Sequence, residues 1–150
     1  MMRRILLGLL VLGWGASGVA QDAGNWRAAS ENARTITGDV YLTGGKVTIN
    51  FAPFTIAEIR SLQPAELGAV FDAAADGPGS GRLYRVAIPA AKRFLHKNSL
   101  CGGEDAQWML SYVSGHSLQL AFFSGSTAPV LSAEAMANGS EICGVFGYVK

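Results

Sequence analysis

The sequence predicts a mainly β domain, built as a small antiparallel sandwich or barrel with one or two short helices and one disulfide bond. Three observations predict this fold. About six short runs alternate apolar and polar residues, and turn signals rich in glycine, serine and proline separate them. The only two cysteines stand in the second half of the chain, where a bridge would join runs that are far apart in sequence.

A predicted export signal precedes this domain. Residues 1–4 carry positive charge, residues 5–12 form an apolar run too short to span a bilayer, and residues 13–20 are mostly small. We expect cleavage after Ala20, because small side chains stand at the positions that a signal peptidase reads. The prediction is a signal peptide over residues 1–20 and one mostly-β domain over residues 21–150, periplasmic or secreted. A retained membrane anchor is the alternative.

Charge is close to balanced once the signal is removed. The whole chain has 12 Lys and Arg against 11 Asp and Glu, and the loss of Arg3 and Arg4 leaves 10 against 11. Nucleic-acid binding calls for basic side chains gathered on one face, and this balance gives no such footprint. No later segment is apolar enough to cross a membrane. We therefore expect no nucleic-acid partner and no membrane span in the mature chain.

The first β signal lies between residues 40 and 51. Residues 40–42 and 46–51 are β-type runs on either side of Gly44-Gly45, which is typical of a hairpin. Alternation in the second run places Val47, Ile49 and Phe51 on one face. Pro53 is expected to interrupt this pattern.

Residues 54–71 are consistent with either strand or helix. Residues 55–58 have the form of a helix capping box, yet residues 54–56 could equally extend the sheet. Pro64 stands at a favoured first helical position, which predicts a short helix through Phe71. The glycine-rich residues 76–81 are expected to form a loop.

The second half of the chain has the stronger β signals. Residues 83–88 alternate and end at Pro89, and residues 107–113 and 118–123 flank a turn at residues 114–117, which predicts a second hairpin. Residues 132–137 are expected to form a single helical turn, and residues 142–149 the last strand.

Cys101 and Cys143 are expected to form a disulfide. An even number of cysteines in an exported chain is typical of a structural bridge, and glycine follows each of them. The alternatives are a catalytic thiol, which needs a neighbouring base, and a zinc site, which needs paired ligand spacings that this sequence lacks. The bridge would tie the last strand to the body of the sheet.

No residues form a recognisable catalytic, cofactor or metal motif, so we expect a protein that is not an enzyme and carries no cofactor. The one local basic cluster, a candidate site for an anionic partner, contains Lys92, Arg93, His96 and Lys97. His116 lies in a Gly-His-Ser turn, and its sequence context narrowly misses a hydrolase nucleophile elbow. Aromatic residues on the strands are expected to pack in the core, although they could also line a ligand cavity.

Several segments of the second half resemble a group of uncharacterised exported bacterial proteins. The resemblance covers roughly residues 83–149 and is carried by Leu83-Tyr84-Arg85-Val86, Leu100-Cys101-Gly102, Leu120-Ala121-Phe122-Phe123-Ser124-Gly125 with Pro129, and Ile142-Cys143-Gly144 with Tyr148. It implies export and a small β fold, and no activity. In plan, a small exported β domain with one disulfide is also similar to periplasmic lysozyme- and protease-inhibitor domains.

These observations favour a non-enzymatic exported β domain that binds a macromolecular partner, as an inhibitor or an envelope accessory. One alternative is a barrel that carries a small apolar ligand, suggested by the aromatic strands. A second alternative is a hydrolase that uses His116 with a serine.

Overall fold

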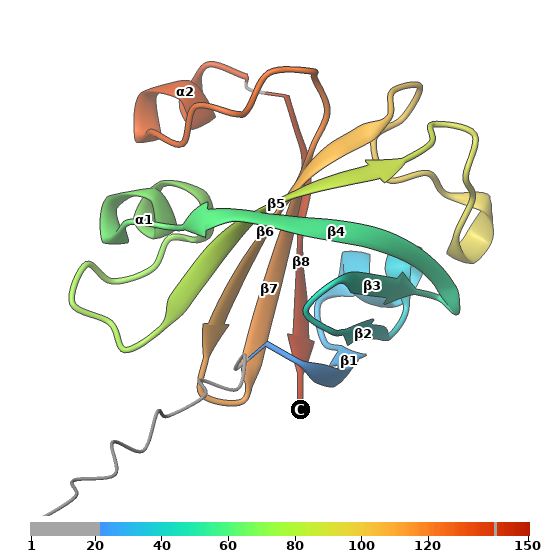
Figure 1. Ribbon diagram of the computed structural model, residues 1–150, viewed down its shortest axis with the longest axis horizontal. Helices are drawn as coiled ribbons and strands as arrows, with labels where there is room; N and C mark the ends of the chain where they lie inside the picture. The colour runs from blue at the N-terminus through green and yellow to red at the C-terminus, as the bar shows by residue number, and fades with distance from the viewer. Residues whose placement is uncertain (1–21, 140) are drawn as a thin grey trace, which may run out of the picture.

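The computed structural model describes residues 22–139 and 141–150, so the predicted signal peptide and its cleavage site lie outside the described residues. The chain forms a closed antiparallel barrel in which each strand pairs with the next and β8 pairs with β1 (Figure 1). The predicted mainly β fold is confirmed. Of its two predicted forms, a sandwich or a barrel, the chain adopts the barrel. The strands are β1 (Gly24–Ala28), β2 (Val40–Leu42), β3 (Lys46–Ile49), β4 (Ala52–Ser61), β5 (Ser80–Ile88), β6 (Ala106–Ser114), β7 (Ser117–Phe123) and β8 (Ile142–Val149).

Four short helical segments lie between the strands. They are η1 (Ala33–Thr37), α1 (Pro64–Phe71), η2 (Leu95–Lys97) and α2 (Ala133–Ala137). The predicted helix from Pro64 to Phe71 is confirmed, and so is the helical turn at α2, where the Ser132 hydroxyl accepts a hydrogen bond from the Ala135 amide. Sequence patterns did not indicate β1 or η1.

Both predicted hairpins are confirmed, but Pro53 does not interrupt the first sheet. Strand β4 includes Pro53, which lies opposite Thr48 of β3. The neighbouring pair, Ile49 and Ala52, flanks a two-residue turn and is the hydrogen-bonded pair. Pro53 therefore falls at the next, non-hydrogen-bonded position, where the missing N–H would point away from β3.

Residues 54–71 contain a strand followed by a helix. The capping box suggested at residues 55–58 is wrong, because those residues belong to β4 and pair with β3 and β5. The capping box of α1 lies at Gln63 and Glu66, whose carboxylate accepts a hydrogen bond from the Gln63 amide at 2.8 Å. Glu66 also forms an ion pair with Arg60 at 2.7 Å, which holds the pKa of the Glu66 carboxyl below its usual value.

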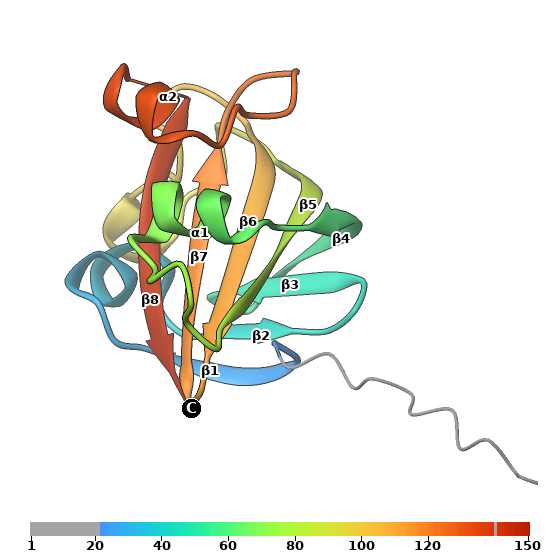
Figure 2. The ribbon, with the colours of Figure 1, turned by 90° about the vertical axis from the view of Figure 1, so that its left-hand side faces the viewer.

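Two hydrophobic cores stabilise the barrel. The first fills its interior with side chains from all eight strands, among them Trp26, Met109, Leu120, Phe122, Phe146 and Tyr148. The second lies outside β5–β8, where α1 and α2 pack over Leu83, Trp108, Leu110, Ala121 and Phe123 (Figure 2). The strands β6 and β7 therefore bury both faces, whereas no helix of the described residues packs across the outer face of β1–β4.

The first described residues are anchored in the barrel wall. Asp22 is only 6% exposed, and its carboxylate accepts hydrogen bonds from the Tyr84 hydroxyl at 2.8 Å and the Ser111 hydroxyl at 3.3 Å. Arg82 forms an ion pair with the same carboxylate at 3.3 Å and with Glu58 at 3.0 Å. Because β1 follows directly, this cluster anchors the strand that closes the barrel.

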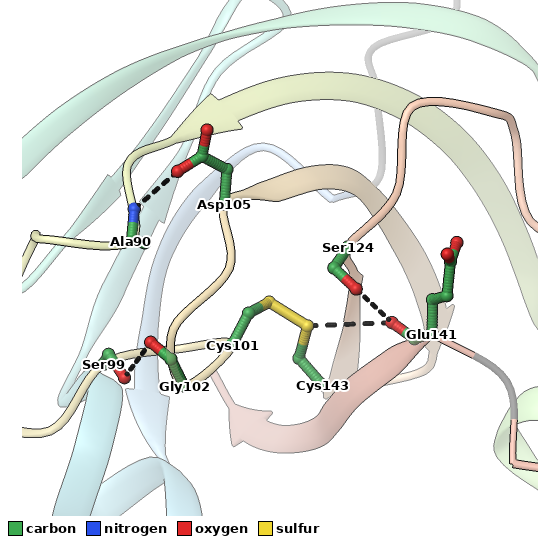
Figure 3. The surroundings of a disulfide bond; sticks show 8 residues. All are labelled: Ala90, Ser99, Cys101, Gly102, Asp105, Ser124, Glu141 and Cys143. Atoms are coloured by element: carbon green, nitrogen blue, oxygen red, sulfur yellow. Dashed lines mark hydrogen bonds between the residues drawn. A yellow bond between two sulfur atoms is a disulfide. The ribbon is translucent and has the colours of Figure 1, made fainter.

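The predicted disulfide between Cys101 and Cys143 is confirmed (Figure 3). It joins the loop before β6 to the second residue of β8, across a sequence separation of 42 residues. On one side of the bridge, the Ser99 hydroxyl donates to the Gly102 carbonyl at 3.0 Å. A structural disulfide of this kind is consistent with an oxidising compartment.

Candidate binding surface

An open groove lies on the outer face of β1–β3, on the half of the barrel that α1 and α2 leave bare. Its volume is about 520 Å³, which is within the range of small-ligand and peptide-side-chain sites. Most of its lining is apolar, although polar side chains stand among the walls. The groove is lined by Asn25, Trp26, Arg27, Gly38, Asp39, Val40, Tyr41, Thr48, Asn50 and Phe51.

The groove forms where two strands separate. Pairing between β1 and β2 ends at Trp26 and Val40, after which Arg27 pairs with Val149 of β8. The chain before β2 turns away toward η1. Asp39 stabilises the point where β1 and β2 separate, because its carboxylate accepts a hydrogen bond from the Ala28 amide at 2.9 Å.

Phe51 stands at the edge of the groove on the tight turn between β3 and β4. Its side chain is 94% exposed. Asn50 and Phe51 both have positive φ, 46° and 67°, as the two central residues of a type I′ turn require. Glycine is the usual residue at the second position, and a bulky side chain there costs about 1–2 kcal/mol. The chain therefore holds a large aromatic side chain in water on a strained backbone.

A row of cross-strand neighbours forms the floor beside Phe51. Tyr41 of β2 lies opposite Asn25 of β1 on one side and Thr48 of β3 on the other. The Tyr41 side chain is 43% exposed, so it offers an aromatic face next to two hydrogen-bonding side chains. This row can contact a peptide or ligand through both apolar and polar groups.

The predicted basic cluster lies on a loop that borders the groove, although none of its four side chains lines the groove. Lys92, Arg93, His96 and Lys97 are all exposed in the loop between β5 and β6. This loop packs against the groove wall, because the Leu95 side chain lies directly over Gly38, where an added Cβ would come within 3.2 Å of it. The Asn98 amide donates to the Thr35 carbonyl of η1 at 3.2 Å, which holds the loop in place.

Sequence patterns missed the groove itself. Alternation placed Phe51 on the buried face with Val47 and Ile49, and for Phe51 this is wrong because the two-residue turn removes it from the strand. Asn50 was the available signal, since asparagine is favoured at the first central position of such a turn.

Neither His116 nor the two cysteines lie in a catalytic or metal-binding arrangement within the described residues, and both cysteines form the disulfide. His116 is exposed in the β6–β7 turn, where its carbonyl accepts a hydrogen bond from the Lys150 amide at 2.9 Å. Within residues 22–139 and 141–150, no three His, Cys, Asp or Glu side chains are grouped as metal ligands would be.

Two buried tyrosines show the largest pKa shifts. Burial, followed by the hydrogen bond to Asp22, raises the pKa of Tyr84 to about 12. Burial also raises the pKa of Tyr148, whose hydroxyl lies 2.7 Å from the Thr37 hydroxyl. Both phenols belong to the packed barrel, since Tyr84 and Tyr148 are among its interior residues.

Comparison with family models, curated proteins and solved structures gives no match for this chain. No helix in the described part of the chain is long and apolar enough to cross a membrane.

Proposed function

We propose that this chain is an exported protein, released by cleavage after Ala20, that binds a macromolecular partner through the groove around Tyr41 and Phe51. In this role it acts as an inhibitor of the partner or as an accessory to it in the cell envelope. The single observation that carries the proposal is Phe51, a 94% exposed aromatic held in a left-handed turn at the edge of an apolar groove.

Two physical properties of Phe51, its exposed aromatic side chain and its strained backbone, favour a role in binding. Burial of a phenylalanine side chain against a partner contributes about 1.5–3 kcal/mol, and aromatic anchors of this kind dominate many protein interfaces. The backbone around Phe51 also costs stability that glycine would not cost. A side chain that opposes folding stability and remains in water is expected where binding needs it.

The packing of the barrel favours an external site. Large side chains such as Met109, Phe122 and Tyr148 occupy the interior, where each is at most 1% exposed. The 520 Å³ groove, by contrast, opens directly to solvent on the bare half of the outer face. A small apolar ligand would therefore find its space in the groove, and this alternative is an outcome of the test below.

Site-specific photocrosslinking tests the proposal. A benzophenone amino acid replaces Phe51 in one variant and Val130 in another, and each variant is exported from the producing cells before illumination. Val130 is a suitable control because it is 69% exposed and lies outside the groove. We expect one discrete macromolecular adduct at position 51 and none at position 130.

Competition makes the experiment decisive. Excess wild-type protein should remove the adduct, whereas the Phe51→Gly variant should compete at least tenfold less well. An adduct that forms equally at both positions, or no adduct at position 51, would overturn the proposal. A small-molecule adduct at position 51 would instead favour the ligand-carrying alternative.

A further inference from the structure

The two halves of the barrel carry opposite charge. Residues 24–55 and 89–105, which form the groove, η1 and the whole β5–β6 loop, contain six Lys and Arg and four Asp and Glu. The other described residues contain four Lys and Arg and seven Asp and Glu. The nearly neutral total therefore hides a basic side, which includes the groove, and an acidic side.

The basic side chains near the groove have no ion-pair partners within the described residues. All three ion pairs lie on the other side, where Arg60 and Arg82 contact Glu58, Glu66 and Asp22. Arg93 donates to the Ala90 carbonyl at 2.7 Å, and the Ala90 amide donates to the Asp105 carboxylate of the same loop at 2.7 Å. Among the described residues, the basic side chains without an ion pair on the groove side are Arg27, Arg34, Lys46, Lys92, Arg93 and Lys97, and on the other side Arg85 and Lys150.

From this arrangement we infer that the groove binds an extended acidic peptide segment of the partner, with an apolar side chain of that segment packed between Tyr41 and Phe51. This inference deepens the proposed function and rests on it. Carboxylates before and after the apolar residue would face Arg27 within the groove and the basic cluster on the loop that borders it at Gly38. The Asn25 and Thr48 side chains stand where they can hydrogen-bond the peptide backbone.

The groove favours a peptide over an anionic membrane. Phe51 and the basic cluster alone would suit a lipid surface, but Asp39 and three uncharged polar side chains also line the groove. Insertion into a bilayer would remove the Asp39 carboxylate and these groups from water without new partners, which is unfavourable. A peptide can satisfy them with its own amides and still present carboxylates to the basic side chains.

Fluorescence anisotropy with synthetic peptides tests the inference. The probes are labelled nine-residue peptides with one central phenylalanine. Four residues stand on each side of it, and they are all Glu, all Lys or all Ser. We expect the acidic peptide to bind at least tenfold more tightly than the basic one at low salt. This preference should fall steeply as salt rises, because the flanking charges are exposed.

Matched variants locate the charge effect. Arg27→Gln and Lys97→Asn each remove one positive charge, and asparagine tolerates the left-handed backbone at position 97, where φ is 60°. Each should weaken acidic-peptide binding by about twofold to fivefold. Ser126→Glu changes the net charge equally at an exposed position outside the groove and should have no effect. Loss of the phenylalanine from the peptide should weaken binding more than either variant.

The outcomes separate the inference from the proposed function. If the photocrosslink at position 51 forms but the acidic peptide binds no better than the basic one, only the inference is overturned. Equal effects of Ser126→Glu and Lys97→Asn would overturn it as well. Binding to vesicles of phosphatidylglycerol, or to single-stranded DNA, in preference to the acidic peptide would identify another anionic partner and also overturn it.

Discussion

Asp22 is expected to be the polar residue on which barrel closure most depends, and Asp22→Ala tests this. The substitution removes the acceptor for two buried hydroxyl groups, those of Tyr84 and Ser111. A buried donor left without a partner costs about 1–3 kcal/mol. Arg82 keeps its ion pair with Glu58, so the loss of its ion pair with Asp22 adds little to the loss of stability.

Two unpaired donors would together cost about 2–6 kcal/mol, and the space for water sets the expected magnitude within that range. The pocket beside Asp22 and Ser111 is about 10 Å³, at the lower limit for one water molecule. Removal of the carboxylate enlarges it, so that water can partly satisfy the two hydroxyl groups. We therefore expect Asp22→Ala to lower the free energy of unfolding by about 2–4 kcal/mol.

A double-mutant cycle with Tyr84→Phe measures this contact. The phenylalanine variant has no hydroxyl to leave unpaired, so Asp22→Ala should cost about 1–2 kcal/mol less in that background. Urea unfolding of the exported protein at neutral pH, followed by tryptophan fluorescence, gives each free energy. Asp76→Ala, in an exposed loop, is the control and should change stability by less than about 0.5 kcal/mol. A cycle that is additive within about 0.5 kcal/mol would refute the reasoning.

Three further predictions concern stability. Phe51→Gly should raise the free energy of unfolding by about 0.5–1 kcal/mol, because relief of left-handed strain exceeds the entropic cost of glycine; a destabilised variant in urea unfolding would contradict this. Replacement of Cys101 and Cys143 by serine should cost about 4 kcal/mol from loop entropy, so a wild-type melting temperature in the double variant would count against it. The raised pKa values of Tyr84 and Tyr148 favour the neutral phenols in the fold, so stability should be intact below about pH 10 and fall as pH rises toward 12. Tyr148→Phe should flatten that fall in urea titrations, and an unchanged slope would show that Tyr148 does not contribute.

Local signals in the sequence were sufficient for most of the individual elements. The hairpin around Gly44-Gly45, the hairpin after residue 113 and the helix from Pro64 were predictable because turn residues and alternation act over a few neighbours. The disulfide was predictable because only two cysteines were available to pair. Short-range rules also failed where pairing register decided the outcome. Pro53 fits within β4 only because it falls at a non-hydrogen-bonded position.

The candidate site depended on contacts between segments distant in sequence. Composition indicated an almost neutral domain, yet closure of the barrel places six of the eight basic residues without an ion pair on the groove side, and the three ion pairs of the described residues on the other side. Alternation assigned Phe51 to the core, whereas the turn holds it in water beside Tyr41. The sequence alone therefore determined that a small disulfide-bonded β domain forms. Only the tertiary structure decided which side chains remain exposed together, because exposure depends on strand pairing and helix packing across the whole chain.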